Sequence, residues 1–310
     1  MPASPLANPT ATREMLERFG LATKHRLGQN FLVDDHVIAR ILDLARLDEG
    51  SHVVEVGPGI GPLTRELSLR ADKVVSIELD RSLLPILAET LSDRPNAEIF
   101  PGDVLKTDLP GLVAEKLAGL SPIACANLPY NVAATIILKY LAEHPSLEAA
   151  VVMVQAEVAD RICAAPGSKA YGAYTAKLNL YGRVTGRFEV PPTCFMPAPH
   201  VNSAVVRIER ASVADPETGA ALGPERLAAT AAVTDAAFAQ RRKTIRNSMA
   251  ARGFEKAALD EAFVAAGVSP TARAETLACE DFVRLASALA AAEAIPADLP
   301  VRFSAGGAGK

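Results

Sequence analysis

Apolar and polar positions along the first two thirds of the chain follow two alternating periods, one typical of strands and one typical of helices. Short apolar runs that indicate buried strands cover residues 52–56, 73–77, 97–100 and 122–126. Leu63 and Leu67 recur at helical spacing after the first of these runs. Because strands that alternate with helices pair in parallel, the region from about residue 51 to 155 predicts a doubly wound α/β sheet.

Two further strand patterns, at about residues 186–190 and 201–209, predict an antiparallel hairpin at the end of this sheet. After residue 210 the pattern changes to Ala-rich helical stretches that are interrupted by glycine and proline. We therefore expect two domains, an α/β domain at residues 1–210 and a small helical domain at residues 211–310.

Three segments lack a clear strand or helix pattern. Residues 215–223 predict a linker between the two domains. The first dozen residues and residues 295–310 are rich in Pro, Gly and Ala, which predicts disordered ends.

The segment Asn127-Leu128-Pro129-Tyr130 places an amide, a rigid turn and an aromatic ring at the end of the apolar run at residues 122–126. Active sites of open α/β sheets lie at such strand ends. The Asn127 side chain and the Leu128 carbonyl can accept the hydrogens of an exocyclic amine such as that of adenine. Tyr130 can stack on the base and face the positive charge that develops during alkylation. Taken alone, the segment is equally well explained as a strand that ends in a proline turn.

A glycine-rich turn, residues 57–61 (GPGIG), lies between the run at residues 52–56 and Pro62, a favourable first residue of a helix. The glycines allow the backbone to approach a bulky ligand. Their Gly-x-Gly-x-Gly spacing differs from the Gly-x-Gly-x-x-Gly spacing that binds a pyrophosphate. The ligand at this turn is therefore expected not to be a diphosphate.

Acidic residues follow the next two strand patterns. Glu78 comes directly after the run at residues 73–77, where a carboxylate can accept both hydroxyls of a ribose. Asp103 follows the run at residues 97–100, where a carboxylate can bind an adenine amino group. Each acid taken singly is more often a solvated loop residue. Together, at the ends of successive strands, they predict a nucleoside pocket that holds no phosphate.

Jointly, these motifs resemble the ribosomal RNA adenine dimethyltransferase family, and most closely its small-subunit dimethyladenosine transferases. The resemblance runs through most of the chain, and the motifs keep the family's order. The matching segments are residues 24–32 (KHRLGQNFL), 55–64 (EVGPGIGPLT), 77–80 (IELD), 102–105 (GDVL), 127–130 (NLPY), 166–169 (PGSK) and 195–203 (FMPAPHVNS).

The resemblance implies a class I methyltransferase fold, with a Rossmann-like sheet and a C-terminal helical domain, that uses S-adenosyl-L-methionine. By motif position, the residues expected to bind this cofactor are Asn30, Leu32, Gly57, Glu78, Asp103 and Asn127. The residues expected at the target adenine are Asn127, Leu128, Tyr130 and Phe195. Phe195 would close the second side of the target base, although an aromatic residue at this position can also belong to the core.

The family moves two methyl groups onto the amino nitrogen of each of two neighbouring adenines in a small-subunit rRNA hairpin. The partners that the resemblance implies are this rRNA and the small ribosomal subunit or its precursor. We expect direct in-line methyl transfer without a metal ion or a covalent enzyme intermediate, because the sulfonium already makes the methyl group electrophilic. The target base has to leave its stack to reach the pocket.

The net charge of −4 is unusual for a nucleic-acid-binding protein, so the distribution of charge matters more than its sum. Residues 236–254 contain five basic residues and no acid. On a helix, Phe238, Ile245 and Met249 would form one apolar face, with the basic side chains beside and beyond it. The candidate RNA-binding residues are Arg241, Arg242, Lys243 and Arg246. A solvated helix face explains the same pattern equally well.

Composition excludes several other classes of protein. The chain contains four widely spaced cysteines and five histidines without metal-ligand spacing, so no metal site is expected. No apolar run approaches the ~18 residues that a membrane-spanning helix requires. We expect a soluble cytoplasmic monomer with reduced cysteines.

Three alternatives remain open at this point. A large-subunit rRNA adenine methyltransferase of the macrolide-resistance type shares the core motifs, but the C-terminal helical domain and residues 195–203 favour a small-subunit enzyme. An adenine DNA methyltransferase would carry a related Asn-Pro-Pro-Tyr turn, whereas Leu128 is the second residue here. A ribosome-assembly factor that mainly binds RNA would use the same surface.

Overall fold

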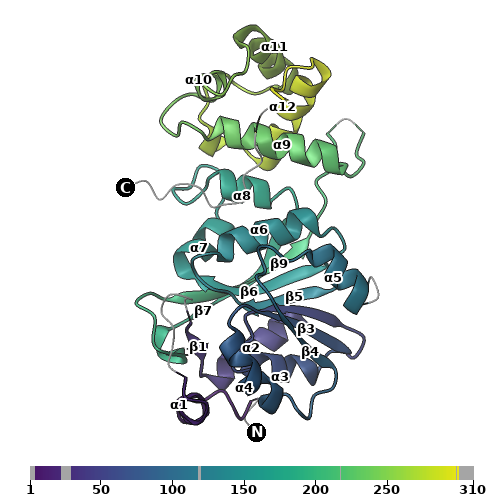
Figure 1. Cartoon of the computed structure of the whole chain (residues 1–310). Helices are drawn as coiled ribbons and strands as arrows, with labels where there is room; N and C mark the ends of the chain where they lie inside the picture. Colours follow the sequence, from purple (N-terminus) through teal and green to yellow (C-terminus); the bar gives the residue numbers. More distant parts are fainter. Residues whose placement is uncertain (1–3, 22–28, 118–119, 217, 298, 300–310) are drawn as a thin grey trace. The chain divides into compact units, whose positions relative to one another are not determined.

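The computed structural model describes residues 4–21, 29–117, 120–216, 218–297 and 299 (Figure 1). The chain divides into two compact units, one formed by Met1–Ala159 with Val184–Glu209 and the other by Asp160–Arg183 with Arg210–Lys310. Residues 22–28, which include much of the first family-like motif, and residues 300–310 of the expected disordered tail lie outside the described residues.

The first unit is built on a seven-stranded sheet. Its strands are β2 (His52–Val56), β3 (Lys73–Glu78), β4 (Ala97–Pro101), β5 (Ile123–Asn127), β6 (Ala149–Gln155), β7 (Gly182–Val190) and β9 (Ser203–Arg210). They lie in the order β4-β3-β2-β5-β6-β9-β7. Neighbouring strands from β4 to β6 run parallel, and β9 runs antiparallel to β6. The predicted doubly wound sheet with an antiparallel end is confirmed.

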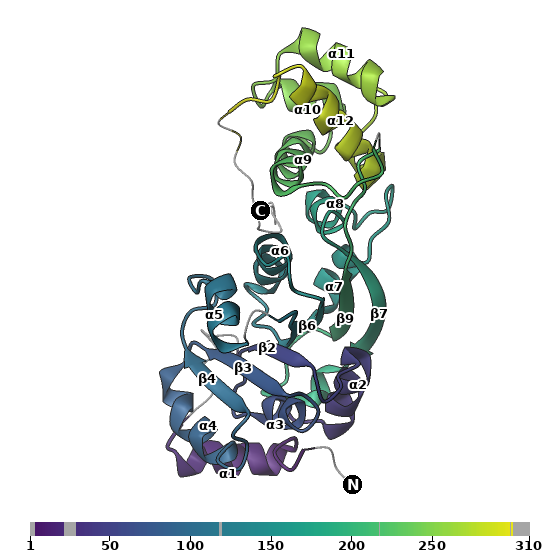
Figure 2. The same cartoon turned by 90° about the vertical axis from the view of Figure 1, so that its right-hand side faces the viewer.

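Helices cover both faces of this sheet (Figures 1 and 2). One face carries α2 (Asp35–Ala45), α3 (Pro62–Ser68) and α4 (Leu84–Thr90), and the other carries α5 (Leu109–Lys116) and α6 (Ala133–Glu143). The remaining elements of the first unit are α1 (Pro9–Arg18), β1 (Phe31–Leu32), η2 (Arg81–Leu83), η3 (Pro192–Cys194) and β8 (Phe195–Met196). Helix α7 (Ala156–Ile162) crosses the boundary between the two units, which lies after Ala159. Because both faces are covered, the central strands are continuous apolar runs and not alternating ones.

Local chemistry explains where the helices of this unit begin. Helix α2 starts after Asp34, whose carboxylate accepts a hydrogen bond from the Val37 backbone N–H at 3.0 Å. Helix α3 starts at Pro62, directly after Gly61 in the left-handed region at φ 91°. The buried residues Ile38, Ile41 and Leu67 then place these helices on the apolar surface of the sheet.

The second unit is helical. It contains α8 (Ala173–Leu178), α9 (Pro224–Ala237), α10 (Ile245–Ala250), α11 (Lys256–Ala266), η4 (Ala274–Thr276) and α12 (Cys279–Ala291). Its core gathers apolar side chains from all of these elements, including Phe263, Phe282 and Leu285. The helices from α9 to α12 lie in the region where the Ala-rich pattern after residue 210 indicates helical structure.

The division of the chain differs from the expected boundary at residue 210 in one segment. Asp160–Arg183 belongs to the helical unit, although it precedes the last strands of the sheet in the sequence. The reason is its packing, because Tyr171 and Ala176 are buried in the helical core. The Tyr171 hydroxyl also donates to the Leu277 carbonyl at 2.9 Å.

The expected linker at residues 215–223 has regular structure in its described part. Ala214 and Ala221 form an antiparallel bridge, and the Asp215 N–H donates to the Ala220 carbonyl at 2.7 Å. Asp215 is 4% exposed and pairs with Arg226. The segment is therefore a small turn that is fixed to the helical unit.

The predicted basic helix over residues 236–254 is wrong, because the chain forms two helices there. Helix α9 ends at Ala237, and α10 begins at Ile245 after Thr244, whose hydroxyl accepts from the Asn247 N–H at 3.4 Å. The buried Ser248 hydroxyl donates to the Ala236 carbonyl and accepts from the Gln240 N–H, which connects the two helices. The apolar residues of the pattern still share one core, but they reach it from separate elements.

Candidate functional site

A cavity of about 270 Å³ opens at the carboxyl ends of β2, β3, β4 and β5. The residues expected at the cofactor all line it, namely Asn30, Leu32, Gly57, Glu78, Asp103 and Asn127. Leu128, Pro129 and Tyr130 line it as well. Because the carboxyl ends of parallel strands meet at one edge of a sheet, motifs far apart in the sequence converge on a single cavity.

The glycine turn forms one wall of this cavity through Gly57 and Gly59. These residues have φ values of 70° and 63°, in the left-handed region that glycine enters without strain. A Cβ atom on Gly59 would also lie 3.2 Å from the Phe31 ring, which is closer than ordinary contact. Any other residue at this position would therefore be strained by its backbone and crowded by its neighbour.

Glu78 ends β3 and presents a carboxylate that is almost completely buried at the cavity wall. Its oxygens accept hydrogen bonds from the Asp80 N–H at 2.7 Å and the Gly59 N–H at 3.4 Å. Burial raises the pKa of Glu78 to about 7, against the lowering effect of these two bonds. This carboxylate is thus a fixed acceptor whose charge changes near neutral pH.

Glu55, on β2, is a cavity residue that the sequence interpretation did not select. It is 1% exposed and accepts hydrogen bonds from the Ser76 and Thr64 hydroxyls at 2.6 and 2.7 Å. Burial raises the pKa of Glu55 to about 7. A glutamate inside an apolar run, in a strand covered on both faces, was the signal that could have identified it.

Asp103 lies beyond β4, where its carboxylate reaches the cavity. One oxygen accepts from the Leu105 N–H at 3.0 Å, and the Lys106 ammonium lies 3.7 Å from the other. The side chain is about one-third exposed, so one oxygen remains accessible to a ligand donor.

The Asn127 side chain is oriented by the N-terminal segment. Its amide nitrogen donates to the Asn30 carbonyl at 3.1 Å, which leaves the amide oxygen available to accept hydrogen bonds from a ligand. The Leu128 backbone N–H donates to the Met153 carbonyl at 3.2 Å. Within the described residues, no protein group donates to the Leu128 carbonyl. Two consecutive residues at the end of β5 therefore each offer an acceptor.

Tyr130 is held by a residue from another part of the chain. Its hydroxyl and the Ser203 hydroxyl share a hydrogen bond of 2.7 Å, and Ser203, the first residue of β9, is completely buried. Tyr130 itself is half-buried and lines the cavity. Ser203 lies in the family-like segment 195–203, but nothing in the local sequence pattern pairs it with Tyr130.

Phe195 lies in the core next to the cavity residue Leu32, and its place beside the target base stays a prediction. It is 4% exposed in the core with Leu32 and Val37, and it pairs with Leu32 where β8 runs antiparallel to β1. It does not belong to the described residues that line the cavity. The two prolines that follow Phe195 favour a loop. In the structure, β8 pairs with β1, and the Phe195 ring packs in the core.

The basic candidates in the helical unit differ from one another in their surroundings. Arg246 is paired with Asp260 through two hydrogen bonds of 2.5 and 2.6 Å, and the Arg241 guanidinium donates to the Lys169 carbonyl at 2.9 Å. Arg242 and Lys243 are exposed in the turn between α9 and α10. Arg241 is exposed as well, but its guanidinium lies 3.9 Å from the Glu275 carboxylate. In the described part of the chain, Arg242 and Lys243 thus differ from Arg241 and Arg246 in having no ion pair.

Two negative findings concern the described part of the chain alone. It contains no group of three or more His, Cys, Asp or Glu side chains that could hold a metal ion. None of its helices combines the length and the apolar character that crossing a membrane requires.

Known proteins with a similar structure share the fold of this chain. The crystal structure of the 23S rRNA methyltransferase ErmE is 28% identical, with a TM-score of 0.64, and the match covers 84% of this chain and 100% of that chain. A dimethyladenosine transferase from Plasmodium falciparum matches with a TM-score of 0.68 and 22% identity over 84% of this chain and 98% of that chain. The class I methyltransferase fold is thus confirmed.

Named relatives that were compared by sequence have higher identities than these two structures. Proteins named ribosomal RNA small subunit methyltransferase A include one from Geobacillus kaustophilus, 43% identical over 294 residues, with 92% of this chain and 97% of the relative covered. Another, from Lysinibacillus sphaericus, is 42% identical over 289 residues, with 92% of this chain and 97% of the relative covered. The model of the family described as ribosomal RNA adenine dimethylase matches residues 20–291. The chain therefore belongs to the ribosomal RNA adenine dimethylase family.

Proposed function

We propose that this protein transfers methyl groups from S-adenosyl-L-methionine to the amino nitrogens of two adjacent adenines in a small-subunit rRNA hairpin. The observation that carries the proposal is the paired acceptors at the end of β5, the Asn127 amide oxygen and the Leu128 carbonyl, beside the half-buried Tyr130 ring. Sequence relatives with the small-subunit name match over nearly their full length, which favours the small-subunit substrate over the large-subunit one.

The cavity residues fit S-adenosyl-L-methionine. Gly57 and Gly59 bring the backbone to the cavity wall, where a bulky ligand can approach it closely. Glu78 would accept the ribose hydroxyls, because its carboxylate is fixed in place by backbone donors. Asp103 would accept from the adenine amino group of the cofactor, while Asn30, Leu32 and Asn127 would complete the pocket. When bound, the cofactor supplies an electrophilic methyl group on a sulfonium.

The chain's own contribution to methyl transfer is positioning and hydrogen-bond acceptance. The amino nitrogen of adenine is a weak nucleophile because its lone pair is delocalised into the ring. The Asn127 amide oxygen and the Leu128 carbonyl would accept its two hydrogens as the nitrogen becomes tetrahedral, and this interaction strengthens toward the transition state. No strong general base is needed, since the nitrogen becomes acidic once it carries the new methyl group.

Tyr130 would hold the target base by stacking and would stabilise the developing positive charge with its ring face. The Ser203 hydroxyl fixes the tyrosine ring at the cavity edge, so the stacking surface exists before the RNA binds. The base enters this site out of its stack, which unpaired or weakly paired RNA loops allow at low cost.

The helical unit would contribute phosphate contacts through Arg242 and Lys243, with Arg241 beside them. Arg246 is a weaker candidate, because Asp260 already balances its charge. The proposed partners are the small-subunit rRNA and the small ribosomal subunit or its precursor, and the proposed setting is the cytoplasm, where the protein acts as a monomer.

Primer extension across small-subunit rRNA from a strain that lacks this gene tests the proposal. Dimethylated adenines block the reverse transcriptase, so the stops at two neighbouring adenines should disappear in the deletion strain and return with the intact gene. If the small-subunit stops persist in the deletion strain, the assigned substrate is wrong. Loss of a stop in large-subunit rRNA would show that the protein modifies the other subunit.

A further inference from the structure

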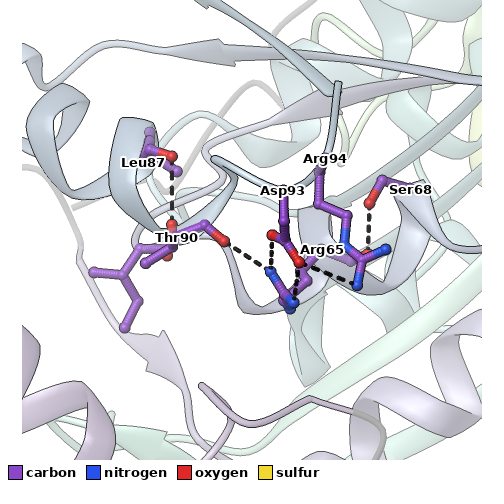
Figure 3. A network of polar contacts seen from close by, with 7 residues as sticks. Arg65, Ser68, Leu87, Thr90, Asp93 and Arg94 are labelled. Atoms are coloured by element: carbon purple, nitrogen blue, oxygen red, sulfur yellow. Dashed lines mark hydrogen bonds and ion pairs between the residues drawn. The ribbon is translucent and has the colours of Figure 1, made fainter. Parts of the chain in front are cut away.

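The glycine turn is held by a network of polar contacts centred on Thr90, the last residue of α4, whose residues do not line the cavity (Figure 3). The Thr90 hydroxyl donates to the Ile60 carbonyl at 3.0 Å. Ile60 is completely buried, and in the described part of the chain no other group donates to this carbonyl. The carbonyl of the turn's isoleucine therefore depends on one threonine hydroxyl.

A second layer of the network fixes Thr90 itself (Figure 3). The Arg65 guanidinium donates to the Thr90 carbonyl at 3.0 Å and binds Asp93 through two hydrogen bonds of 2.6 and 2.7 Å. The Arg94 guanidinium lies 3.6 Å from the same carboxylate. The hydrogen bonds from Arg65 lower the pKa of Asp93 to about 2, so this pair stays charged at neutral pH.

The contact between the turn and α4 is tight. Gly61 has a φ of 91°, and a Cβ atom there would lie 3.1 Å from the Thr90 hydroxyl oxygen and 3.4 Å from the Leu87 side chain. Gly57 and Gly59 line the cavity, whereas Thr90, Arg65 and Asp93 are not among the described residues that do so. The network therefore contacts the turn without contacting the ligand space.

We propose that Thr90 is a positioning residue that holds residues 57–61 in the conformation that receives the cofactor, with Arg65 supporting it. The glycines that let the backbone adopt left-handed conformations also give the free turn many alternative conformations. A turn that is fixed before binding loses less entropy when the ligand arrives, so its affinity is higher. The inference rests on the proposed cofactor, because it assigns Thr90 a role in binding that molecule.

The test compares Thr90→Val, which keeps the shape but removes the hydroxyl, with Thr90→Ser, which keeps the hydroxyl. We expect Thr90→Val to raise the Kd and the KM for S-adenosyl-L-methionine by about tenfold, with kcat at saturating cofactor changed by less than about twofold. Thr90→Ser should stay within about threefold of the wild-type Kd. Arg65→Met, which acts one contact further away, should raise the Kd by only about threefold.

Thr234→Val is the matched control. Thr234 is 1% exposed in α9 of the helical unit, and its hydroxyl donates to the Thr230 carbonyl at 2.7 Å. This variant removes a buried threonine hydroxyl away from the cavity and should keep the wild-type Kd. Equal shifts of the Kd in both valine variants would mean that Thr90 acts only through overall stability, and would overturn the inference.

Hydrogen exchange of the ligand-free protein separates this inference from the proposed function. In Thr90→Val, the backbone amides of residues 57–61 should exchange faster, while those of β5 keep their protection. If the wild-type protein does not bind S-adenosyl-L-methionine at all, the proposed function fails, whatever the exchange shows. If the wild-type protein binds S-adenosyl-L-methionine, and Thr90→Val has the same amide exchange and the same affinity, the positioning role is wrong while the proposed function still stands.

Discussion

The cavity edge of the sheet and the basic turn of the helical unit differ in how their functional side chains are held. At the cavity, Glu78, Asn127 and Tyr130 each have a hydrogen-bond partner that fixes them before any ligand arrives. In the turn between α9 and α10, Arg242 and Lys243 extend into solvent. The first region suits chemistry that depends on fixed geometry, and the second suits contacts that depend mainly on charge.

This difference predicts how each region responds to mutation. Removing a fixed hydrogen-bond acceptor should change a rate or a specific affinity steeply, because the transition state depends on its position. Removing an exposed cation should change binding modestly and in a salt-dependent way.

The largest effect is expected for Asn127→Ala. It removes an acceptor that is used most strongly in the transition state, so kcat should fall by about 10²- to 10³-fold while the protein remains folded. The measurement is single-turnover methyl transfer to small-subunit rRNA, with thermal melting as the check of folding. Asn247→Ala, at an exposed position in α10, is the matched control and should keep the wild-type rate. Near wild-type turnover in Asn127→Ala would remove Asn127 from the mechanism.

Glu78→Ala should weaken S-adenosyl-L-methionine binding by about 1 to 3 kcal/mol, the cost of losing hydrogen bonds to a charged group. The wild-type affinity should also rise as the pH increases through about 7. Burial raises the pKa of Glu78 from 4.5 to about 7, so the carboxyl is neutral below this pH and an ionised acceptor above it.

Calorimetry between pH 6 and 8 measures both effects of Glu78→Ala. Since Glu55 also has a pKa raised to about 7, Glu55→Gln shows how much of the pH dependence belongs to the second carboxyl. A wild-type affinity that is constant across this range would reject Glu78 as the titrating acceptor for the ribose.

The double variant Arg242→Ala/Lys243→Ala should weaken RNA binding by about tenfold and reduce the salt slope by about two, because two fewer counterions are released. Arg246→Ala should have a smaller effect, since Asp260 already pairs with Arg246. Titrations at several salt concentrations measure this, with Lys256→Ala, another exposed cation of the helical unit, as the control. An unchanged salt slope in a stable double variant would place the RNA-binding surface elsewhere.

The smallest effect is expected for Ser203→Ala, which releases the Tyr130 ring without changing it. We expect the KM for RNA to rise by about threefold, as for the loss of one neutral hydrogen bond, with no change in cofactor affinity. Tyr130→Phe should match it, and the two changes together should cost no more than either alone, because they break the same bond. Fully additive effects would show that Ser203 does not act through Tyr130.

The residues that line the cavity were easier to predict from the sequence than the residues that hold them in place, and the reason is physical. Asn127, Glu78 and the glycines lie at strand ends, and parallel pairing brings strand ends together whatever the details of packing. The hydrogen bonds that hold these residues in place could not be predicted in this way. Ser203, Asn30 and Thr90 contact partners that are far away in the sequence. Local periodicity contains no information about such contacts.

The break in the helix over residues 236–254 and the burial of Phe195 both depend on packing between distant segments. A helix pattern over residues 236–254 is compatible with one helix or two, and the Thr244 cap with the Ser248 contacts stabilises two. Phe195 carries the same apolar ring whether it faces a ligand or the core, and pairing of β8 with β1 decides for the core. In both cases tertiary packing selected between alternatives that the local sequence left open.

The most direct test of the proposed function is methylation of small ribosomal subunits from a strain without this activity, using purified protein and S-adenosyl-L-methionine. Nucleoside mass spectrometry of the separated rRNAs measures the product. The proposed function predicts N6,N6-dimethyladenosine in small-subunit rRNA with wild-type protein and its near absence with Asn127→Ala. Dimethyladenosine confined to large-subunit rRNA, or equal amounts from the wild type and Asn127→Ala, would contradict it.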